Sequence, residues 1–110
     1  KNKKIKMSPG KQILDISHID AISDGFINLI FNKKTNKKCK RTFFASTQNR
    51  LTLKKLMTKC EKILKKDLNI QWGKIDYRKN VIMSPIKFSQ NQNICKREKL
   101  DFRLKNFLLN

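Results

Sequence analysis

The feature that most constrains the fold is a set of apolar residues whose spacing matches one face of an α-helix. They recur at intervals of three, one, three, three and one, at Leu53, Leu56, Met57, Cys60, Ile63 and Leu64. Lysines fall on the opposite face, at Lys55, Lys59, Lys62 and Lys66. This division of apolar and charged residues is typical of a surface helix that covers a core. Because Ser46 and Thr47 offer N-cap chemistry just upstream, we predict an amphipathic helix at about 48–66.

Upstream of this helix, three short segments are rich in β-forming residues. They are separated by polar or glycine-containing turns and lie at about 11–17, 26–31 and 39–45. The polar stretch at 32–38 has the length of a hairpin loop, which predicts antiparallel pairing of the last two strands. The apolar stripe of the helix would then cover one face of this sheet. The predicted fold class is therefore α+β, with antiparallel strands capped by one amphipathic helix.

Downstream of the helix, the chain becomes polar and weakly patterned. Residues 76–95 include the turn dipeptide Ser84-Pro85 and are predicted to be a linker. A short amphipathic helix is predicted within 96–110 from the apolar residues Leu100, Leu104, Phe107 and Leu108. Its apolar face has no obvious partner in the preceding segments. We therefore interpret the chain as part of one domain, at about 1–75, joined by the linker to the beginning of another.

Length and charge limit the classes of protein to which this chain can belong. It has 110 residues, of which 38% are hydrophobic, so it can bury one modest core but cannot contain a complete multidomain enzyme. No apolar run reaches the ~18 residues of a membrane span. Its 27 Lys and Arg against 8 acidic residues give a net charge of +19, which favours polyanionic partners. The abundance of Lys and Asn indicates that compositional bias also contributes to this charge.

Few residues could support catalysis or metal binding. His18 is the only histidine, and in a strand the adjacent Ser17 would point to the opposite face. The aspartates at 15–24 lack the spacing and the glycine of a calcium loop. The three cysteines are odd in number and form no CxxC, which fits a reducing cytosolic setting better than zinc or disulfides. We therefore expect no catalytic residues, metal or cofactor within this chain.

Positive charge is concentrated in one part of the sequence. Residues 32–66 contain thirteen Lys or Arg against Glu61 alone, a local charge of +12. A solvated outer helix face is the simplest explanation, and attraction to an anionic membrane, at ~1 kcal/mol per well-placed basic residue, is the functional alternative. RNA binding is a weaker alternative, because no exposed aromatic pattern accompanies the basic residues. The candidate membrane contacts lie in and just after the predicted hairpin loop, at Lys33, Lys34, Lys37, Lys38, Lys40 and Arg41.

Four segments carry a family resemblance. They are ILDISHIDAISDG (13–25), FINLIF (26–31), KRTFFAST (40–47) and EKIL (61–64). In this order they resemble a strand with its turn, the next strand, the last strand and the end of the helix in the second half of a pleckstrin homology domain. The similarity is closest to the pleckstrin homology domain of phosphoinositide-specific phospholipases C. It covers about residues 3–66.

The sequence departs from that family in two respects. The family helix usually carries a Trp that faces the sheet, and here Leu56 or Met57 stands in its place. The first strands of the family, with the basic loop that holds a phosphoinositide headgroup, have no counterpart in this chain. The resemblance therefore implies a partial pleckstrin homology domain, and it does not transfer a headgroup-binding role to particular residues.

The resemblance also implies a cellular setting. It implies a cytoplasmic, peripheral membrane protein whose partners are an anionic or phosphoinositide-containing membrane surface and the remaining domains of its parent. A parent phospholipase C would hydrolyse a phosphoinositide with calcium, using residues outside this chain, and would have EF-hand-like helices where 96–110 begins. Two other hypotheses remain open: a pleckstrin-homology-like membrane- or protein-binding module of a non-enzymatic signalling protein, and a small basic RNA-binding protein.

Overall fold

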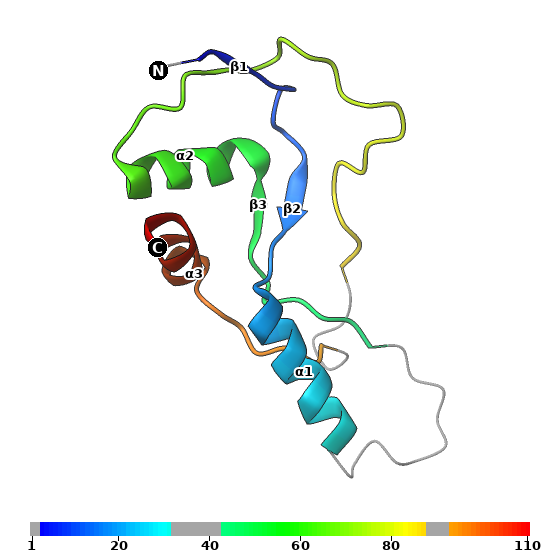
Figure 1. Ribbon diagram of the computed structural model, residues 1–110. Coiled ribbons are helices and arrows are strands. Elements are labelled where there is room, and N and C mark those ends of the chain that lie inside the picture. The colour runs from blue at the N-terminus through cyan, green and yellow to red at the C-terminus, as the bar shows by residue number, and fades with distance from the viewer. Residues whose placement is uncertain (1–2, 32–42, 88–92) are drawn as a thin grey trace. The chain divides into compact units, whose positions relative to one another are not determined.

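A computed structural model describes residues 3–31, 43–87 and 93–110 (Figure 1). The described part is α+β, as predicted, and its strands form two two-stranded sheets and no closed barrel. In chain order the elements are β1 (Ile5–Lys6), β2 (Ile13–Asp15), α1 (Ile19–Phe31), β3 (Arg50–Thr52), α2 (Leu53–Leu64), β4 (Ile70–Gln71) and α3 (Leu100–Leu109).

The chain divides into two compact units, each built from segments that are distant in the sequence. Unit 1 comprises Lys1–Leu14, Arg50–Pro85 and Asp101–Asn110. Unit 2 comprises Asp15–Asn49 and Ile86–Leu100. Unit 1 therefore contains α2 and all of α3 except its first residue, and unit 2 contains α1.

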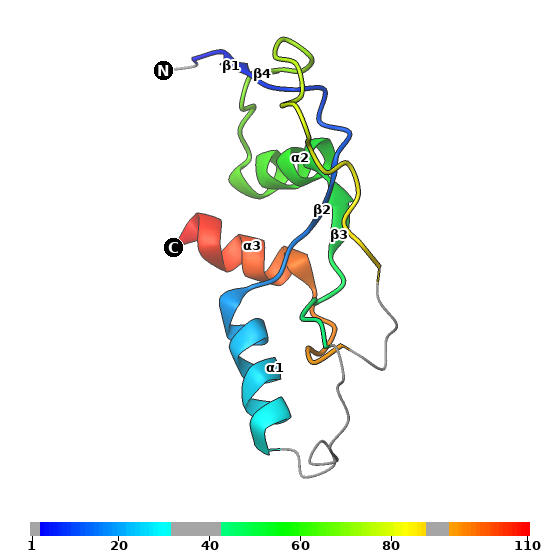
Figure 2. The ribbon, with the colours of Figure 1, turned by 90° about the vertical axis from the view of Figure 1, so that its right-hand side faces the viewer.

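In unit 1, β1 and β4 form a parallel pair, which Figure 2 shows near the N-terminus. Ile5 is opposite Ile70, and the Met7 amide extends the ladder by donating to the Gln71 carbonyl at 3.1 Å. A parallel pair requires a long crossover between its strands, and here the crossover includes α2. Neither of these two strands was predicted from the sequence.

β2 pairs with β3, the short strand that leads directly into α2. The Leu53 amide donates to the Gln12 carbonyl at 3.1 Å, and the Ile16 amide donates to the Asn49 carbonyl at 3.1 Å. As the chain advances from 12 to 16 its partners run backwards from 53 to 49, which is the order of an antiparallel pair. The strand predicted at 11–17 is thus confirmed in its centre.

α2 lies within the helix predicted at 48–66, but it begins later. Its N-cap is Thr52, whose side-chain oxygen accepts the Lys55 amide, because the residues immediately before it are held in β3. It ends at Lys65, which adopts the left-handed conformation with φ 52° and donates its amide to the Glu61 carbonyl. The predicted apolar stripe is buried or half-buried along its length, and Cys60 is the most covered member, with 8% of its surface exposed.

Trp72, just after β4, packs against the turn that follows β1. Gly10 at that turn is buried and has φ +72°. A Cβ on Gly10 would lie 2.4 Å from a Trp72 ring carbon, so only glycine permits both the backbone angle and this approach. The Lys54 amide also donates to the Gly10 carbonyl at 3.1 Å, which ties the turn to the first turn of α2.

The strand predicted at 26–31 is wrong, because these residues form the second half of α1. Their apolar residues continue the helical spacing of Ile19 and Ile22, a period that the short run 26–31 does not reveal alone. Gly25, in the middle of α1, is buried, and a Cβ there would lie 2.8 Å from the Ile94 carbonyl oxygen. A helix with a glycine at this point can approach the 93–95 segment closely, and a hairpin strand would lose that contact.

The remaining predicted elements are only partly within the described residues. In the segment predicted as a strand at 39–45, residues 39–42 lie outside the described part, and 43–45 form only an isolated parallel bridge, between Phe44 and Asn93. Residues 76–87 contain no helix or strand. The helix predicted within 96–110 is present as α3.

Candidate functional site

The six membrane contacts proposed from the sequence all fall at 33–41, outside the residues that the structure describes. Their surroundings are therefore not part of the site described below. The lysines of α2, which the sequence also assigned to an outward face, are described. The candidate site lies on the exposed side of this helix.

The exposed side of α2 carries a row of basic side chains. Lys55 and Lys62 are both exposed and stand two turns apart, roughly 10 Å along the helix axis at ~1.5 Å per residue. Lys65 and Lys66 are exposed at the C-terminal end, where positive charge also complements the helix dipole. We call these four residues, Lys55, Lys62, Lys65 and Lys66, the α2 basic row.

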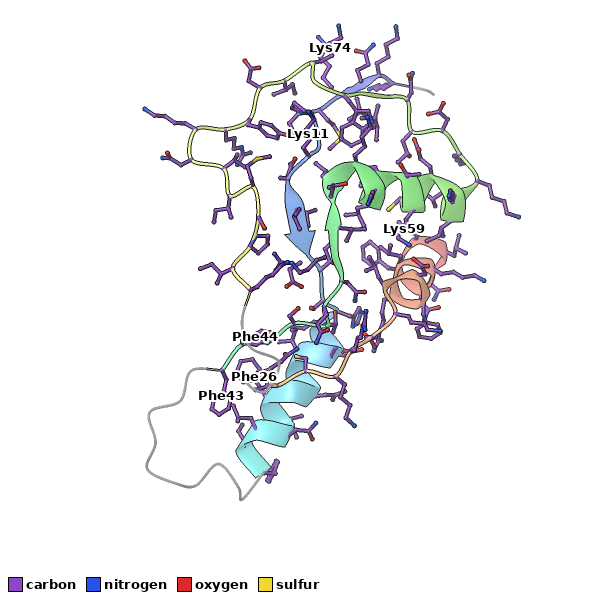
Figure 3. All side chains as sticks on the ribbon, turned by 180° about the vertical axis from the view of Figure 1, so that it is seen from behind. Lys11, Phe26, Phe43, Phe44, Lys59 and Lys74 are labelled. Atoms are coloured by element: carbon purple, nitrogen blue, oxygen red, sulfur yellow. The ribbon has the colours of Figure 1, made fainter. Side chains whose placement is uncertain are left out.

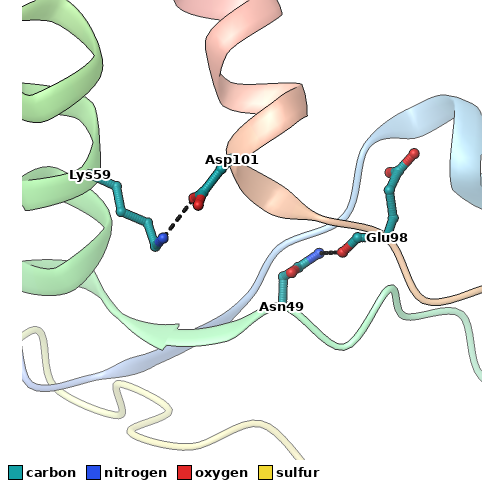
Figure 4. Close-up of polar contacts among 4 residues, drawn as sticks. All are labelled: Asn49, Lys59, Glu98 and Asp101. Atoms are coloured by element: carbon teal, nitrogen blue, oxygen red, sulfur yellow. Dashed lines mark hydrogen bonds and ion pairs between the residues drawn. The ribbon is translucent and has the colours of Figure 1, made fainter.

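Two other lysines of α2 have partners inside unit 1. The Lys59 ammonium lies 2.6 Å from the Asp101 carboxylate at the start of α3 (Figure 4), and Figure 3 shows Lys59 between these two helices. The Lys54 ammonium lies over the Trp72 ring at 5.8 Å from its centroid. These two residues therefore make contacts within unit 1 and do not belong to the basic row.

The acidic group of α2 is turned away from the basic row. Glu61 uses its carboxylate to accept the Leu68 amide at 3.1 Å, in the chain that follows the helix. Among the described residues no carboxylate forms an ion pair with a member of the α2 basic row. The row therefore presents four lysines without an ion-pair partner among the described residues.

The basic character extends over the rest of unit 1. Its described residues include sixteen Lys and Arg against four acidic residues. Lys11 and Lys74, which Figure 3 labels, are both exposed, as are the three lysines at 3–6. The α2 basic row thus lies within a unit in which basic residues strongly outnumber acidic ones.

In unit 2, the most buried polar groups form a hydrogen-bonded knot around Ser46. Only 5% of Ser46 is exposed, and its hydroxyl lies 2.7 and 2.9 Å from the two carboxylate oxygens of Asp15. The side-chain amide of Asn93 brackets the Ser46 backbone, accepting its N–H at 3.2 Å and donating to its carbonyl at 2.8 Å. A hydroxyl bound in this way has no access to a substrate, so the knot is structural.

Thr47 is the centre of the same knot, with 0% of its surface exposed. Its amide donates to the Ser17 hydroxyl at 2.9 Å, and its own hydroxyl donates to the Ile16 carbonyl at 3.1 Å. The Asn49 amide group donates to the Thr47 hydroxyl at 2.8 Å. It also donates to the Glu98 carbonyl at 2.9 Å, which Figure 4 shows. The sequence suggested helix capping for Ser46 and Thr47, and no local signal predicted partners about thirty residues away.

The remaining candidates for chemistry are not brought together. His18 stands before α1, where its Nδ1 accepts the Asp20 amide at 3.2 Å, which is a helix-capping contact. Burial raises the pKa of the Cys60 thiol, with a further contribution from the Glu61 charge, and burial also raises the pKa of Cys95. Such thiols are poorly nucleophilic. No group of three or more potential metal ligands occurs among the described residues.

Comparison of the chain with protein-family models, with curated proteins and with solved structures finds no match. Within the described residues, no helix combines the length and the apolar character that crossing a bilayer requires.

Proposed function

We propose that this chain associates with anionic membrane surfaces through the α2 basic row. The observation that carries the proposal is the division of α2 into an apolar face, which is covered, and an outer face whose lysines lack ion-pair partners among the described residues. A polyanionic surface attracts such a row, because all four of its members are exposed.

The expected strength of the contact is modest. At ~1 kcal/mol per basic residue close to an anionic surface, the four residues of the row contribute at most about 4 kcal/mol. That corresponds to about millimolar affinity, so unit 1 would need its other lysines or a second membrane contact for stable association. The contact would weaken strongly with salt, since the screening length is ~8 Å at physiological ionic strength.

Sedimentation with vesicles of phosphatidylcholine, with and without phosphatidylserine, tests the proposal. The variant Lys55→Gln/Lys62→Gln/Lys66→Gln should bind phosphatidylserine vesicles about 100-fold more weakly, from the loss of three contributions of ~1 kcal/mol each. The control Lys3→Gln/Lys4→Gln/Lys79→Gln changes the net charge equally but leaves α2 intact. It should lose less than about tenfold. Equal losses in the two variants would show that bulk charge alone is responsible.

Two further arms of the same experiment separate the alternatives. Vesicles that contain a phosphoinositide at matched surface charge would reveal headgroup preference beyond charge. A labelled single-stranded RNA would reveal nucleic-acid binding, which should show a steep dependence on salt. Phe43 and Phe44 are both half-buried, so they do not offer the exposed stacking surface that RNA recognition generally uses. Strong RNA binding together with no vesicle binding would overturn the membrane proposal.

For the parent protein, we propose a phosphoinositide-specific phospholipase C in which this chain belongs to the membrane-associating region. The support is the order of the four similar segments and the presence of an amphipathic helix after them. The helix at 26–31 departs from the strand expected in a pleckstrin homology domain, so the proposal rests on the sequence and not on a shared fold. Sequencing the transcript beyond Asn110 tests it: EF-hand loops and a catalytic barrel would support it, and a stop codon would contradict it.

A further inference from the structure

A five-residue pattern, Met-Ser-Pro-x-Lys, occurs twice in the chain, as MSPGK at 7–11 and as MSPIK at 83–87. In each copy the proline restricts the preceding serine to extended backbone, and a lysine follows two residues later. A serine followed by Pro and then by a basic residue at this distance is the pattern that proline-directed protein kinases accept. The two copies offer the same local chemistry, so their surroundings decide which serine a kinase can use.

The second copy is accessible. Ser84 is exposed and lies in irregular chain at 81–87, without helix or strand. The Arg50 guanidinium, from β3, donates to the Ser84 hydroxyl at 3.3 Å and to the Pro85 carbonyl at 2.6 Å. The Ser84 hydroxyl oxygen accepts the hydrogen bond from Arg50, so the hydroxyl proton of Ser84 takes no part in this contact. A positively charged donor therefore already stands at the serine oxygen.

The first copy is held by backbone hydrogen bonds on both sides of its serine. Before Ser8, the Met7 amide donates to the Gln71 carbonyl at 3.1 Å in the β1–β4 ladder. After it, the buried Gly10 has φ +72° and accepts the Lys54 amide at 3.1 Å. A kinase binds its substrate segment in extended form, so this copy would have to open locally before it could react.

We propose that Ser84 is a phosphorylation site of a proline-directed protein kinase and that Arg50 binds the resulting phosphate. In the reaction, the Ser84 oxygen attacks the γ-phosphorus of ATP, the new oxygen–phosphorus bond forms, and the bond from that phosphorus to the β–γ bridging oxygen breaks, releasing ADP. The hydroxyl proton passes to the catalytic carboxylate of the kinase.

The phosphate would change the local electrostatics at a defined place. It adds about −1.5 to −2 charge and three acceptor oxygens, and a guanidinium can donate to two of them at once. Because Arg50 belongs to β3, the contact would fasten the chain around Ser84 to the sheet strand that leads into α2. This inference does not depend on membrane binding and can be tested without vesicles.

The site assignment is tested on the full chain with a purified cyclin-dependent protein kinase and Mg-ATP, followed by mass spectrometry of the phosphopeptides. Ser84 should be modified at least about tenfold faster than Ser8, because Ser84 is exposed in irregular chain, whereas Ser8 is half-buried between the β1–β4 ladder and the buried Gly10. Pro85→Ala should abolish modification of Ser84 and leave Ser8 unchanged. Equal rates at the two serines, or faster modification of Ser8, would overturn the assignment.

The role of Arg50 is tested by phosphorus NMR titration of the chain phosphorylated at Ser84. A nearby guanidinium favours the doubly charged phosphate, so the second pKa of the phosphoserine should lie below its usual value of about 6. Arg50→Gln should raise this pKa to the usual value, and Arg50→Lys should restore only part of the decrease, since it lacks the planar pair of donors. An unchanged pKa in Arg50→Gln would overturn the role given to Arg50.

Discussion

At the scale of single residues, hydroxyl and amide groups organise unit 2. Thr47 and Ser46 are almost fully buried, and each is bound to groups that lie about thirty residues or more away in the sequence. A buried polar group that loses its partner costs free energy, whereas a fully paired one specifies a single arrangement. The hydrogen bonds of the knot therefore fix the position of the segment at 43–49 within unit 2.

Thr47→Val tests the contribution of this knot to stability. The change preserves the shape of the side chain but removes the hydroxyl that binds the Ile16 carbonyl and the Asn49 amide. The free energy of unfolding should fall by about 1–3 kcal/mol in urea titrations followed by circular dichroism. Thr58→Val, at an exposed position of α2, is the matched control and should change it by about 0.5 kcal/mol or less. Equal effects at the two positions would contradict the importance of the knot.

Cys60 gives a prediction about pH. Burial raises the pKa of its thiol in the folded chain, so the folded state favours the protonated form more than the unfolded state does. The corresponding stability is present below the usual thiol pKa of about 8.5 and is lost as pH rises through the elevated value. Alkylation of Cys60 by iodoacetamide at about pH 8.5, followed by mass spectrometry, should therefore be slower in the folded chain than in urea. The same rate in both conditions would show that this thiol is not protected.

At the scale of elements, α2 is the helix that its own sequence defines best. It has an N-cap side chain at Thr52 and a C-terminal residue, Lys65, in the left-handed conformation. The cap bond and the covered apolar stripe both favour the same boundaries. Lys65 is the exception: it does not favour the C-terminal boundary of α2, because a residue with a Cβ is strained at φ 52°.

Lys65→Gly should therefore stabilise the chain. Glycine adopts the left-handed conformation without this strain, and the expected increase in the free energy of unfolding is about 0.5–1 kcal/mol. Lys66→Gly removes the same charge at a position without left-handed backbone, so it should give no increase. Thr52→Ala should decrease stability by about 1 kcal/mol through the loss of the N-cap. Thermal unfolding of the three variants would measure these differences, and stabilisation by Lys66→Gly would contradict the explanation.

At the scale of the whole molecule, the described residues bury little apolar surface. Cys60 is the only buried hydrophobic side chain among them. Many large apolar side chains are exposed instead, among them Ile30, Phe31, Ile82, Ile86 and Phe107. Since apolar burial supplies most of the stability of a folded chain, the isolated chain should be only marginally stable.

Marginal stability has a measurable consequence. The isolated chain should bind the dye ANS in native buffer, because it exposes apolar surface, and its thermal unfolding should be broad. Phe31→Ser and Ile30→Ser on α1 should reduce dye binding. They should leave the helix content almost unchanged, since both side chains are already exposed. A sharp unfolding transition with no dye binding would contradict this description.

The candidate site was predictable in part. The lysines opposite the apolar stripe of α2 follow from the 3.6-residue period, which is a local property. The sequence could not predict which of these lysines form ion pairs. Lys55 and Lys62 have no carboxylate partner among the described residues, whereas Lys59 is paired with Asp101. That partner lies 42 residues away and reaches α2 only because α3 packs in the same unit.

The sequence by itself determined the α+β class and the existence, face and approximate position of α2, because propensity and periodicity within one segment favour the same structure. Tertiary structure decided the rest. The run at 26–31 suits a strand or a helix equally well in isolation, and it is helical where Gly25 allows α1 to lie against Ile94 and Cys95. The parallel pairing of β1 with β4 and the bonds of Thr47 likewise join distant segments, and such contacts leave no periodic signal in the sequence.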